Sequence, residues 1–173
     1  SVTAMDIDEG KVNLINKHQS PIKDKEIEDY LVNKKLDLKA TINKNEAYKD
    51  ANFIIIAVPT DYDIATGSFN TDIVEEIIKD ILLLNTAATI VIKSTVPIGF
   101  TDMIKSKHSI SNIFFSPEFL RETKALYDNL YPSRIVVGEA NDEAAEFANL
   151  LLEASLNDKD QIKVLKMSSK EAE

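Results

Sequence analysis

The sequence has 173 residues, 44% of them hydrophobic, a net charge of −9 and no cysteine. This length is typical of a single domain with a substantial core, and the missing cysteines exclude disulfides and thiolate metal sites within the chain. No apolar run approaches the roughly 18 residues that span a bilayer, and residues 1–6 do not resemble a signal peptide, so we expect a cytoplasmic protein without membrane contact. The negative net charge argues against a nucleic-acid partner. The two histidines are isolated from other ligand residues, so we expect no metal site.

Strand-like and helix-like segments alternate from the first residues onward. Residues 3–7 are expected to form a short strand and residues 8–17 a weak helix. Asp24 is a candidate cap for a helix through residue 32. The continuous apolar run at 53–58 is typical of a strand that is buried on both faces.

The second half of the chain repeats this alternation more clearly. Isoleucine, valine and leucine recur at helical spacing after Asn70 and Thr71, either of which can cap the helix. Asn141 caps a further helix, whose first turn is acidic and therefore suits the helix dipole. Apolar runs predict strands over residues 89–92, 112–115, 134–137 and 161–165.

This alternation predicts an α/β fold with a Rossmann-like, doubly wound and mainly parallel sheet, formed by a single domain over residues 1–173. In such sheets ligands bind beyond the carboxyl ends of the strands. The residues at these ends are therefore the candidates for chemistry: Asp6, Thr60, Thr95 and residues 116–122.

Asp6 closes the first predicted strand. In a dinucleotide fold an acid at this position hydrogen-bonds the adenosine ribose and repels a 2′-phosphate, which favours NAD over NADP. The alternative is that Asp6 only caps the helix that follows. The glycine fingerprint G-x-G-x-x-G does not occur among the four glycines of the sequence. We therefore expect either that the first βα unit of the fold precedes Asp6 outside this chain, or that the fold binds no dinucleotide.

Polar residues also follow later strands. Thr60 and Thr95 each stand after a buried run, where a hydroxyl can meet a ligand; the alternatives are a polar turn at Thr60 and a helix cap at Thr95. Glu118 and Glu122 are four residues apart, so a helix would bring them onto one face. In a closed site one of these carboxylates can act as a general base, and the alternative is a solvated helix start.

Four segments together resemble the UDP-glucose/GDP-mannose dehydrogenase family. Their order and intervals match the family, and the resemblance covers essentially the whole chain. The run F-S-P-E-F-L-R-E, joined to K-A-L-Y-D-N-L, favours the UDP-glucose branch over the GDP-mannose and N-acetylmannosamine branches. The segments are F-I-I-I-A-V-P-T at 53–60, I-K-S-T-V-P-I-G at 92–99, F-S-P-E-F-L-R-E at 115–122 and Y-P-S-R-I-V-V-G at 131–138.

The resemblance implies an oxidoreductase of nucleotide-sugar metabolism and polysaccharide biosynthesis, which uses NAD to oxidise UDP-glucose to UDP-glucuronate. In the family the sugar C6 alcohol becomes an aldehyde and then a carboxylate, and two NAD molecules are reduced. A cysteine captures the aldehyde as a thiohemiacetal, and hydride loss then gives a thioester that water hydrolyses.

The same resemblance assigns cofactor contacts to four residues of this chain. Asp6 would hold the adenosine ribose, and Lys11 would lie near the phosphates or the ribose. Thr60 and Thr95 would contact the cofactor, and Thr95 would also help to position the catalytic water.

Substrate and catalytic contacts are implied for the segment after residue 115. Glu118 would sit beside the reacting sugar. Glu122 would be the general base for thioester hydrolysis and would also touch the nicotinamide side. Phe119 and Leu120 would offer backbone groups to the substrate, and Tyr127 would approach its diphosphate.

In the family pattern the catalytic cysteine, an oxyanion-stabilising lysine and asparagine, a dimerising helix and a uridine-binding domain all follow this segment. We therefore expect a homodimer for the complete enzyme and no activity for these 173 residues alone, which contain no cysteine. Two alternatives stay open. One is a receiver-type regulatory domain with Asp61 as its only candidate phosphoacceptor, and the other is a dehydrogenase-like domain that only binds a nucleotide.

Overall fold

The computed structural model describes residues 1–64 and 67–173, apart from the side chains of Asp63, Ser68 and Glu122. The chain forms two compact units, and each is described by itself. The first unit contains residues 1–51 and 120–129, and the second unit contains residues 52–119 and 130–173. Within the described residues no helix is long and apolar enough to cross a membrane.

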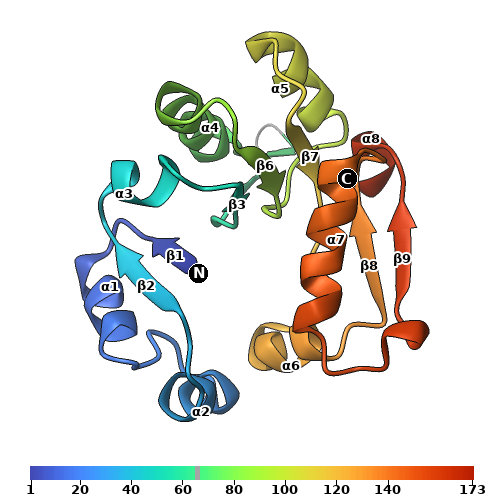
Figure 1. Cartoon of the computed structure of the whole chain (residues 1–173). Helices are drawn as coiled ribbons and strands as arrows, with labels where there is room; N and C mark the ends of the chain where they lie inside the picture. Colours follow the sequence, from blue (N-terminus) through green and yellow to red (C-terminus); the bar gives the residue numbers. More distant parts are fainter. Residues whose placement is uncertain (65–66) are drawn as a thin grey trace. The chain divides into compact units, whose positions relative to one another are not determined.

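The first unit is built around two parallel strands, β1 (Val2–Met5) and β2 (Leu38–Thr41), which pair in register with Ala4 opposite Ala40. They are joined by the helices α1 (Glu9–Asn16) and α2 (Lys25–Asn33), and α3 (Lys44–Tyr48) follows β2 (Figure 1). The Asn16 side chain donates to the carbonyl of Ala40 at 2.9 Å and accepts its amide at 2.8 Å, which ties the end of α1 to β2. The 3₁₀ turn η1 (Glu122–Lys124) and most of α6 (Ala125–Leu130) also belong to this unit.

Two capping side chains fix where the helices of the first unit begin. Asp8 accepts the amides of Gly10 and Lys11 at the start of α1. Asp24 accepts the amides of Glu26 and Ile27 at the start of α2, as the sequence predicts. Each cap satisfies amides that have no partner within the helix.

The second unit contains the parallel strands β3 (Phe53–Ile56), β6 (Thr89–Ile92) and β7 (Ile113–Phe115), with β6 in the centre. A second parallel pair consists of β8 (Arg134–Val137) and β9 (Lys163–Lys166). A short antiparallel pair, β4 (Tyr62–Asp63) and β5 (Ser68–Phe69), follows β3. The four strands β3, β6, β7 and β8 confirm the expected apolar strands, although β9 begins two residues later than predicted.

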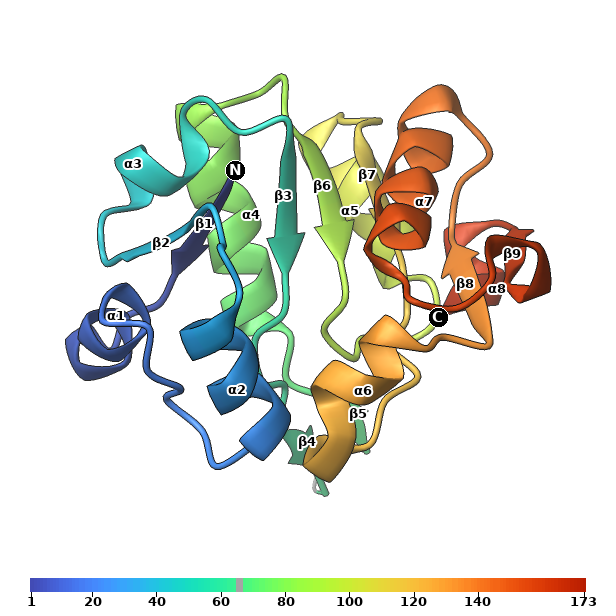
Figure 2. The same cartoon turned by 60° about the horizontal axis from the view of Figure 1, so that its bottom comes forward.

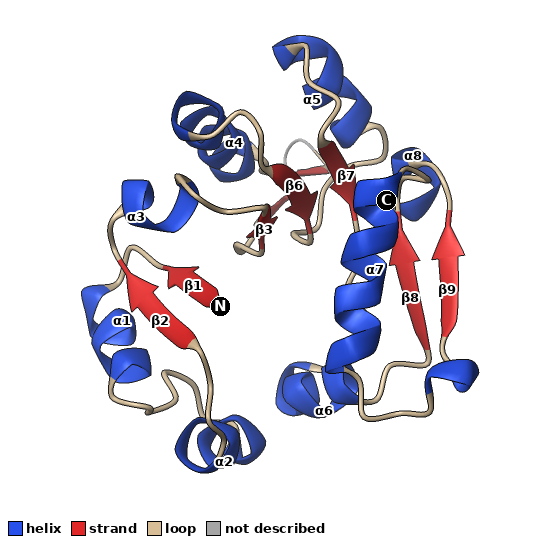
Figure 3. Cartoon of the chain, in the orientation of Figure 1, coloured by secondary structure: helices blue, strands red, loops and turns tan. Residues whose placement is uncertain are grey.

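The remaining elements of the second unit are helices that lie on both faces of its strands (Figures 2 and 3). On one face Phe147 of α7 packs against Val91 of β6 and Phe114 of β7, and the ring centroids of Phe114 and Phe147 are 5.8 Å apart. Strand side chains alternate between faces, so Ile90 and Ile113 point to the opposite face. These helices and turns are α4 (Asp72–Leu84), α5 (Phe100–His108), α7 (Asp142–Ala154), η2 (Lys159–Gln161) and α8 (Ser169–Ala172).

One expectation about burial is wrong. The run at 53–58 does not form a strand buried on both faces, because the Ile55 side chain is 50% exposed whereas Ile54 and Ile56 are buried. Helix α7 reaches Phe53 but covers mainly β6, β7 and β8 on that face. Among the described residues β3 pairs with β6 alone, so it is an edge strand of its sheet.

Gly138 allows β8 to approach the end of β7 closely. Its amide donates to the carbonyl of Phe115 at 2.7 Å, and Ser169 accepts the Phe115 amide and donates to the Gly138 carbonyl. A Cβ at position 138 would lie 2.6 Å from the Phe115 carbonyl oxygen and 2.8 Å from Ser169 Cα. Only glycine fits this approach, which brings the chain after β7 beside the chain after β8.

Candidate functional site

Asp6 follows β1 directly, at the carboxyl end where the fold is expected to bind its ligand. One carboxylate oxygen accepts the amide of Asp8 at 2.9 Å, and the other lies 3.7 Å from the ammonium of Lys11. Both side chains are 41–49% exposed, so they remain accessible to a ligand. The structure therefore brings together two predicted cofactor residues, Asp6 and Lys11.

The alternative role for Asp6 as a helix cap is wrong. The cap of α1 is Asp8, which accepts two helical amides, whereas Asp6 accepts the amide of the cap residue itself. The helix begins at Glu9, so a residue two positions before the cap does not reach its orphan amides.

A buried serine joins the ends of β3 and β6. The Ser94 hydroxyl accepts the amide of Val58 and donates to its carbonyl, each at 2.8 Å. This contact fixes the segment that leads to Thr60, and exposed Thr95 comes directly after the serine. The alternative role of Thr95 as a helix cap is wrong, because α5 begins at Phe100 after Gly99, whose φ is +88°.

Glu118 lies in a segment that forms neither a helix nor a strand, so it does not share a helical face with Glu122. The Glu118 side chain is 35% exposed, and its carboxylate lies 3.8 Å from the ammonium of Lys93. For Glu122 the alternative of a solvated helix start is not contradicted, because η1 begins at that residue and leads into α6. The family resemblance assigned no role to Lys93, although a basic residue directly after a buried strand was a visible signal in the sequence.

Phe119 follows Glu118 and is the last residue of this stretch in the second unit. Its side chain is 52% exposed, and the guanidinium carbon of Arg134 lies 4.2 Å from the centroid of its ring. Arg134 is the first residue of β8, so the contact ties the segment after β7 to the start of that strand. This cation–π contact holds the aromatic side chain, while the main chain of Phe119 belongs to neither a helix nor a strand.

The first unit holds the other predicted substrate residues. Arg121 forms a bidentate ion pair with Asp128, with its Nη2 2.6 Å from Oδ1 and its Nε 3.0 Å from Oδ2. This guanidinium lowers the pKa of the Asp128 carboxyl to about 2. The pair connects Arg121, which precedes the turn η1, with α6, and so it fixes the backbone of Glu122 between them. The side chain of Glu122 lies outside the described part of the structure. Tyr127 of α6 is 44% exposed. Leu120 is half-buried.

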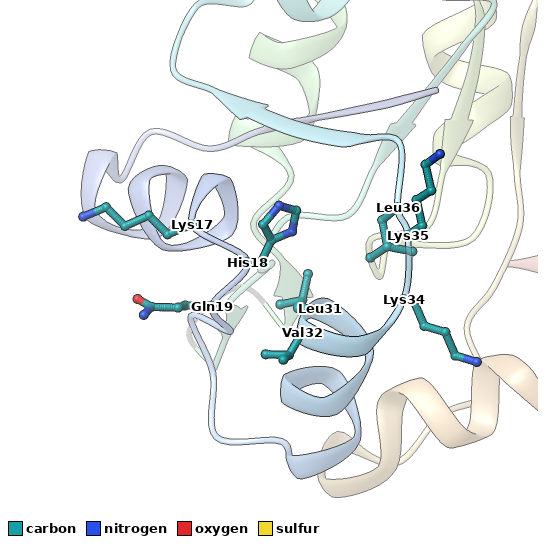
Figure 4. Close-up of a pocket in the computed structure, with 8 residues that line it drawn as sticks. All are labelled: Lys17, His18, Gln19, Leu31, Val32, Lys34, Lys35 and Leu36. Carbon is teal, nitrogen blue, oxygen red and sulfur yellow. The ribbon is translucent and has the colours of Figure 1, made fainter.

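A hollow of about 590 Å³ opens elsewhere on the first unit (Figure 4). It lies at the carboxyl-terminal ends of α1 and α2, away from the predicted site residues, none of which lines it. Its lining residues are Lys17, His18, Gln19, Leu31, Val32, Lys34, Lys35 and Leu36.

Comparison with known proteins decides the family. The model of the NAD binding domain of the UDP-glucose/GDP-mannose dehydrogenase family matches residues 1–155. The chain belongs to this family. NAD is accordingly the cofactor of the domain, and the receiver-type alternative with Asp61 as phosphoacceptor is wrong.

Individual relatives agree with this membership. UDP-glucose 6-dehydrogenases from Campylobacter jejuni and Streptococcus pneumoniae are 48% and 47% identical to the chain over 99% of its length. The chain spans 43% and 45% of these relatives, less than half of each. A solved UDP-glucose dehydrogenase from Pyrobaculum islandicum has a TM-score of 0.81 at 26% identity and covers 99% of the chain, which in turn covers 41% of that protein. The expected Rossmann-like α/β fold is confirmed.

Proposed function

We propose that the whole protein containing this chain is an NAD-dependent UDP-glucose 6-dehydrogenase, which oxidises UDP-glucose to UDP-glucuronate. The observation that carries the proposal is the series of family motifs at strand ends, in a chain 48% identical to a UDP-glucose 6-dehydrogenase over 172 residues. We also propose that this protein is a homodimer in the cytoplasm and that residues 1–173 belong to a single NAD-binding domain.

The residues after β1 fit an NAD molecule in charge and in hydrogen-bonding capacity. The accessible Asp6 carboxylate accepts ribose hydroxyls and disfavours a 2′-phosphate. The Lys11 ammonium, 3.7 Å from that carboxylate, supplies positive charge for a phosphate or for the ribose edge. Thr60 and Thr95 contribute hydroxyls at the ends of β3 and β6. When bound, NAD accepts the hydride that the oxidation releases.

The residues after β6 and β7 act on the substrate. Thr95 orients a water molecule or the sugar hydroxyl, and Glu118 accepts a hydrogen bond beside the reacting carbon. Phe119 and Leu120 offer backbone groups to the substrate, and Tyr127 approaches its diphosphate. Glu122 contacts the nicotinamide side and takes a proton from the water that hydrolyses the acyl intermediate.

The proposed function is tested by turnover of the purified full-length protein with NAD and a panel of nucleotide sugars. We expect NADH formation with UDP-glucose, and at least tenfold lower kcat/KM with GDP-mannose and UDP-N-acetylmannosamine, a ratio equal to about 1.4 kcal/mol. Tight NAD binding without turnover of any of these sugars would instead support the domain that only binds a nucleotide. Preference for another sugar would contradict the assigned substrate.

A further inference from the structure

Lys93 is a cationic side chain enclosed at the carboxyl end of β6. Its side chain is only 13% exposed, and its amide donates to the carbonyl of Ile56 at 2.9 Å, which fixes its backbone against the end of β3. Burying an ammonium is unfavourable unless oxygen atoms surround it. A lysine held this way therefore needs partners that the fold supplies at this point.

Three oxygen atoms of the segment after β7 face the Lys93 ammonium. Strands β6 and β7 run parallel with Ile92 opposite Phe115, so the chain after each strand leaves the sheet side by side. The ammonium makes long hydrogen bonds of 3.5 Å to the carbonyls of Ser116 and Pro117 and lies 3.8 Å from the Glu118 carboxylate.

Burial and the charge of Glu118 have opposite effects on the ionisation of Lys93. Burial lowers the pKa of Lys93, and the negative charge of Glu118 acts in the opposite direction and favours the ammonium. Inside a protein such a pair is screened less than a surface pair. The Lys93 ammonium thus holds two backbone carbonyls and a carboxylate in one arrangement. The Lys105–Glu139 pair of the same unit differs, because it joins two side chains.

We propose that Lys93 is the positioning residue for Glu118: it clamps the Ser116–Pro117 backbone and the Glu118 carboxylate together, so that Glu118 meets the substrate in a fixed orientation. This inference rests on the proposed function. Lys93 does not touch the reacting atoms, and it acts through Glu118. A misplacement of about 1 Å in such a group can cost roughly 10²-fold in rate.

The test is a double-mutant cycle on kcat/KM for UDP-glucose in the full-length protein, with Lys93→Met, Glu118→Gln and both together. Methionine keeps most of the length of the lysine stem and removes the charge. We expect Lys93→Met to lower kcat/KM by about 10–100-fold and to add no further loss on top of Glu118→Gln. Lys93→Arg keeps the charge and is expected to retain more activity than Lys93→Met.

Lys105→Met is the matched control, because Lys105 is also partly buried and ion-paired with a glutamate, at 2.8 Å. We expect this control to leave kcat/KM within about threefold of wild type. Losses that multiply in the double variant would show a general structural role and overturn the inference, as would wild-type activity in Lys93→Met. If wild-type protein itself does not oxidise UDP-glucose, the proposed function fails instead, and the two failures are distinct.

Discussion

The two carboxylate oxygens of Asp6 have different surroundings, which bears on the role that we propose for this residue in binding the cofactor. One oxygen receives the Asp8 amide and so shapes the turn before α1, while the other oxygen lies near Lys11 and is accessible. This division suits a residue that meets a ribose, because the turn fixes the carboxylate before the ligand arrives.

We expect Asp6→Asn in the full-length protein to weaken NAD binding about tenfold to a hundredfold, since a hydrogen bond to a charged group contributes about 1.5–3 kcal/mol. Discrimination against NADP should fall as well, because the repulsion of a 2′-phosphate is lost. Titration calorimetry with both cofactors measures the two effects. The matched control is Asp8→Asn, which removes the same charge two residues away but keeps a good helix cap. Equal affinities in Asp6→Asn and wild type would remove Asp6 from the cofactor site.

Glu122 is the residue at which a catalytic and a solvated role differ most clearly. Glu122→Gln keeps the size and polarity of the side chain but cannot accept a proton. We expect turnover to fall by about 10²–10⁴-fold, with the acyl intermediate retained on the protein and visible as an added sugar-nucleotide mass. A merely exposed carboxylate contributes no more than about 1 kcal/mol. Near-normal turnover without an adduct would transfer the role to Glu118 or to another residue.

At the scale of the elements, a close backbone contact joins β8 to the end of β7. We expect Gly138→Ala to destabilise the protein by about 1–3 kcal/mol, because the new Cβ would meet the Phe115 carbonyl oxygen at 2.6 Å and force the backbone to shift. Chemical denaturation measures this change. The control is Gly10→Ala in α1, whose Cβ meets the Asp8 carboxylate tip at 3.0 Å and should change stability by less than about 1 kcal/mol. Equal stabilities of the two variants would contradict the close approach.

Elements with strong local signals were predictable from the sequence. Asp24 and Asn141 cap α2 and α7 as expected, and β6, which is apolar after Thr89, is buried along its whole length. The strand β2 was missed because Lys39 and Ala40 are weak strand formers, and its pairing with β1 and its contacts with Asn16 supply what the local sequence lacks. Tertiary contacts of this kind leave little trace in a single sequence.

Some positions of the candidate site were predictable from the sequence, and others were not. The positions of Asp6, Thr60 and Thr95 at strand ends follow from the alternation of elements, so they were predictable. The irregular course of the chain around Glu118 was not, because it depends on Pro117 and on the ammonium of Lys93, which follows the neighbouring strand. That contact follows from the register of β6 and β7, which the sequence does not state.

At the scale of the whole molecule, the chain supplies only part of the chemistry that its family implies. The proposed general base and the proposed cofactor contacts lie within these 173 residues, whereas the sequence contains no cysteine to capture an aldehyde. The chain spans less than half of the relatives it matches, so activity must be measured on the full-length protein.

The ratio of NADH formed to UDP-glucuronate formed by the purified full-length protein tests the central claim most directly. Oxidation of a primary alcohol to a carboxylate removes four electrons, and each NAD accepts two as a hydride. We predict two NADH for every UDP-glucuronate, with no free aldehyde released during turnover. A ratio of one with accumulation of the aldehyde, or no NADH at all with UDP-glucose, would contradict the account.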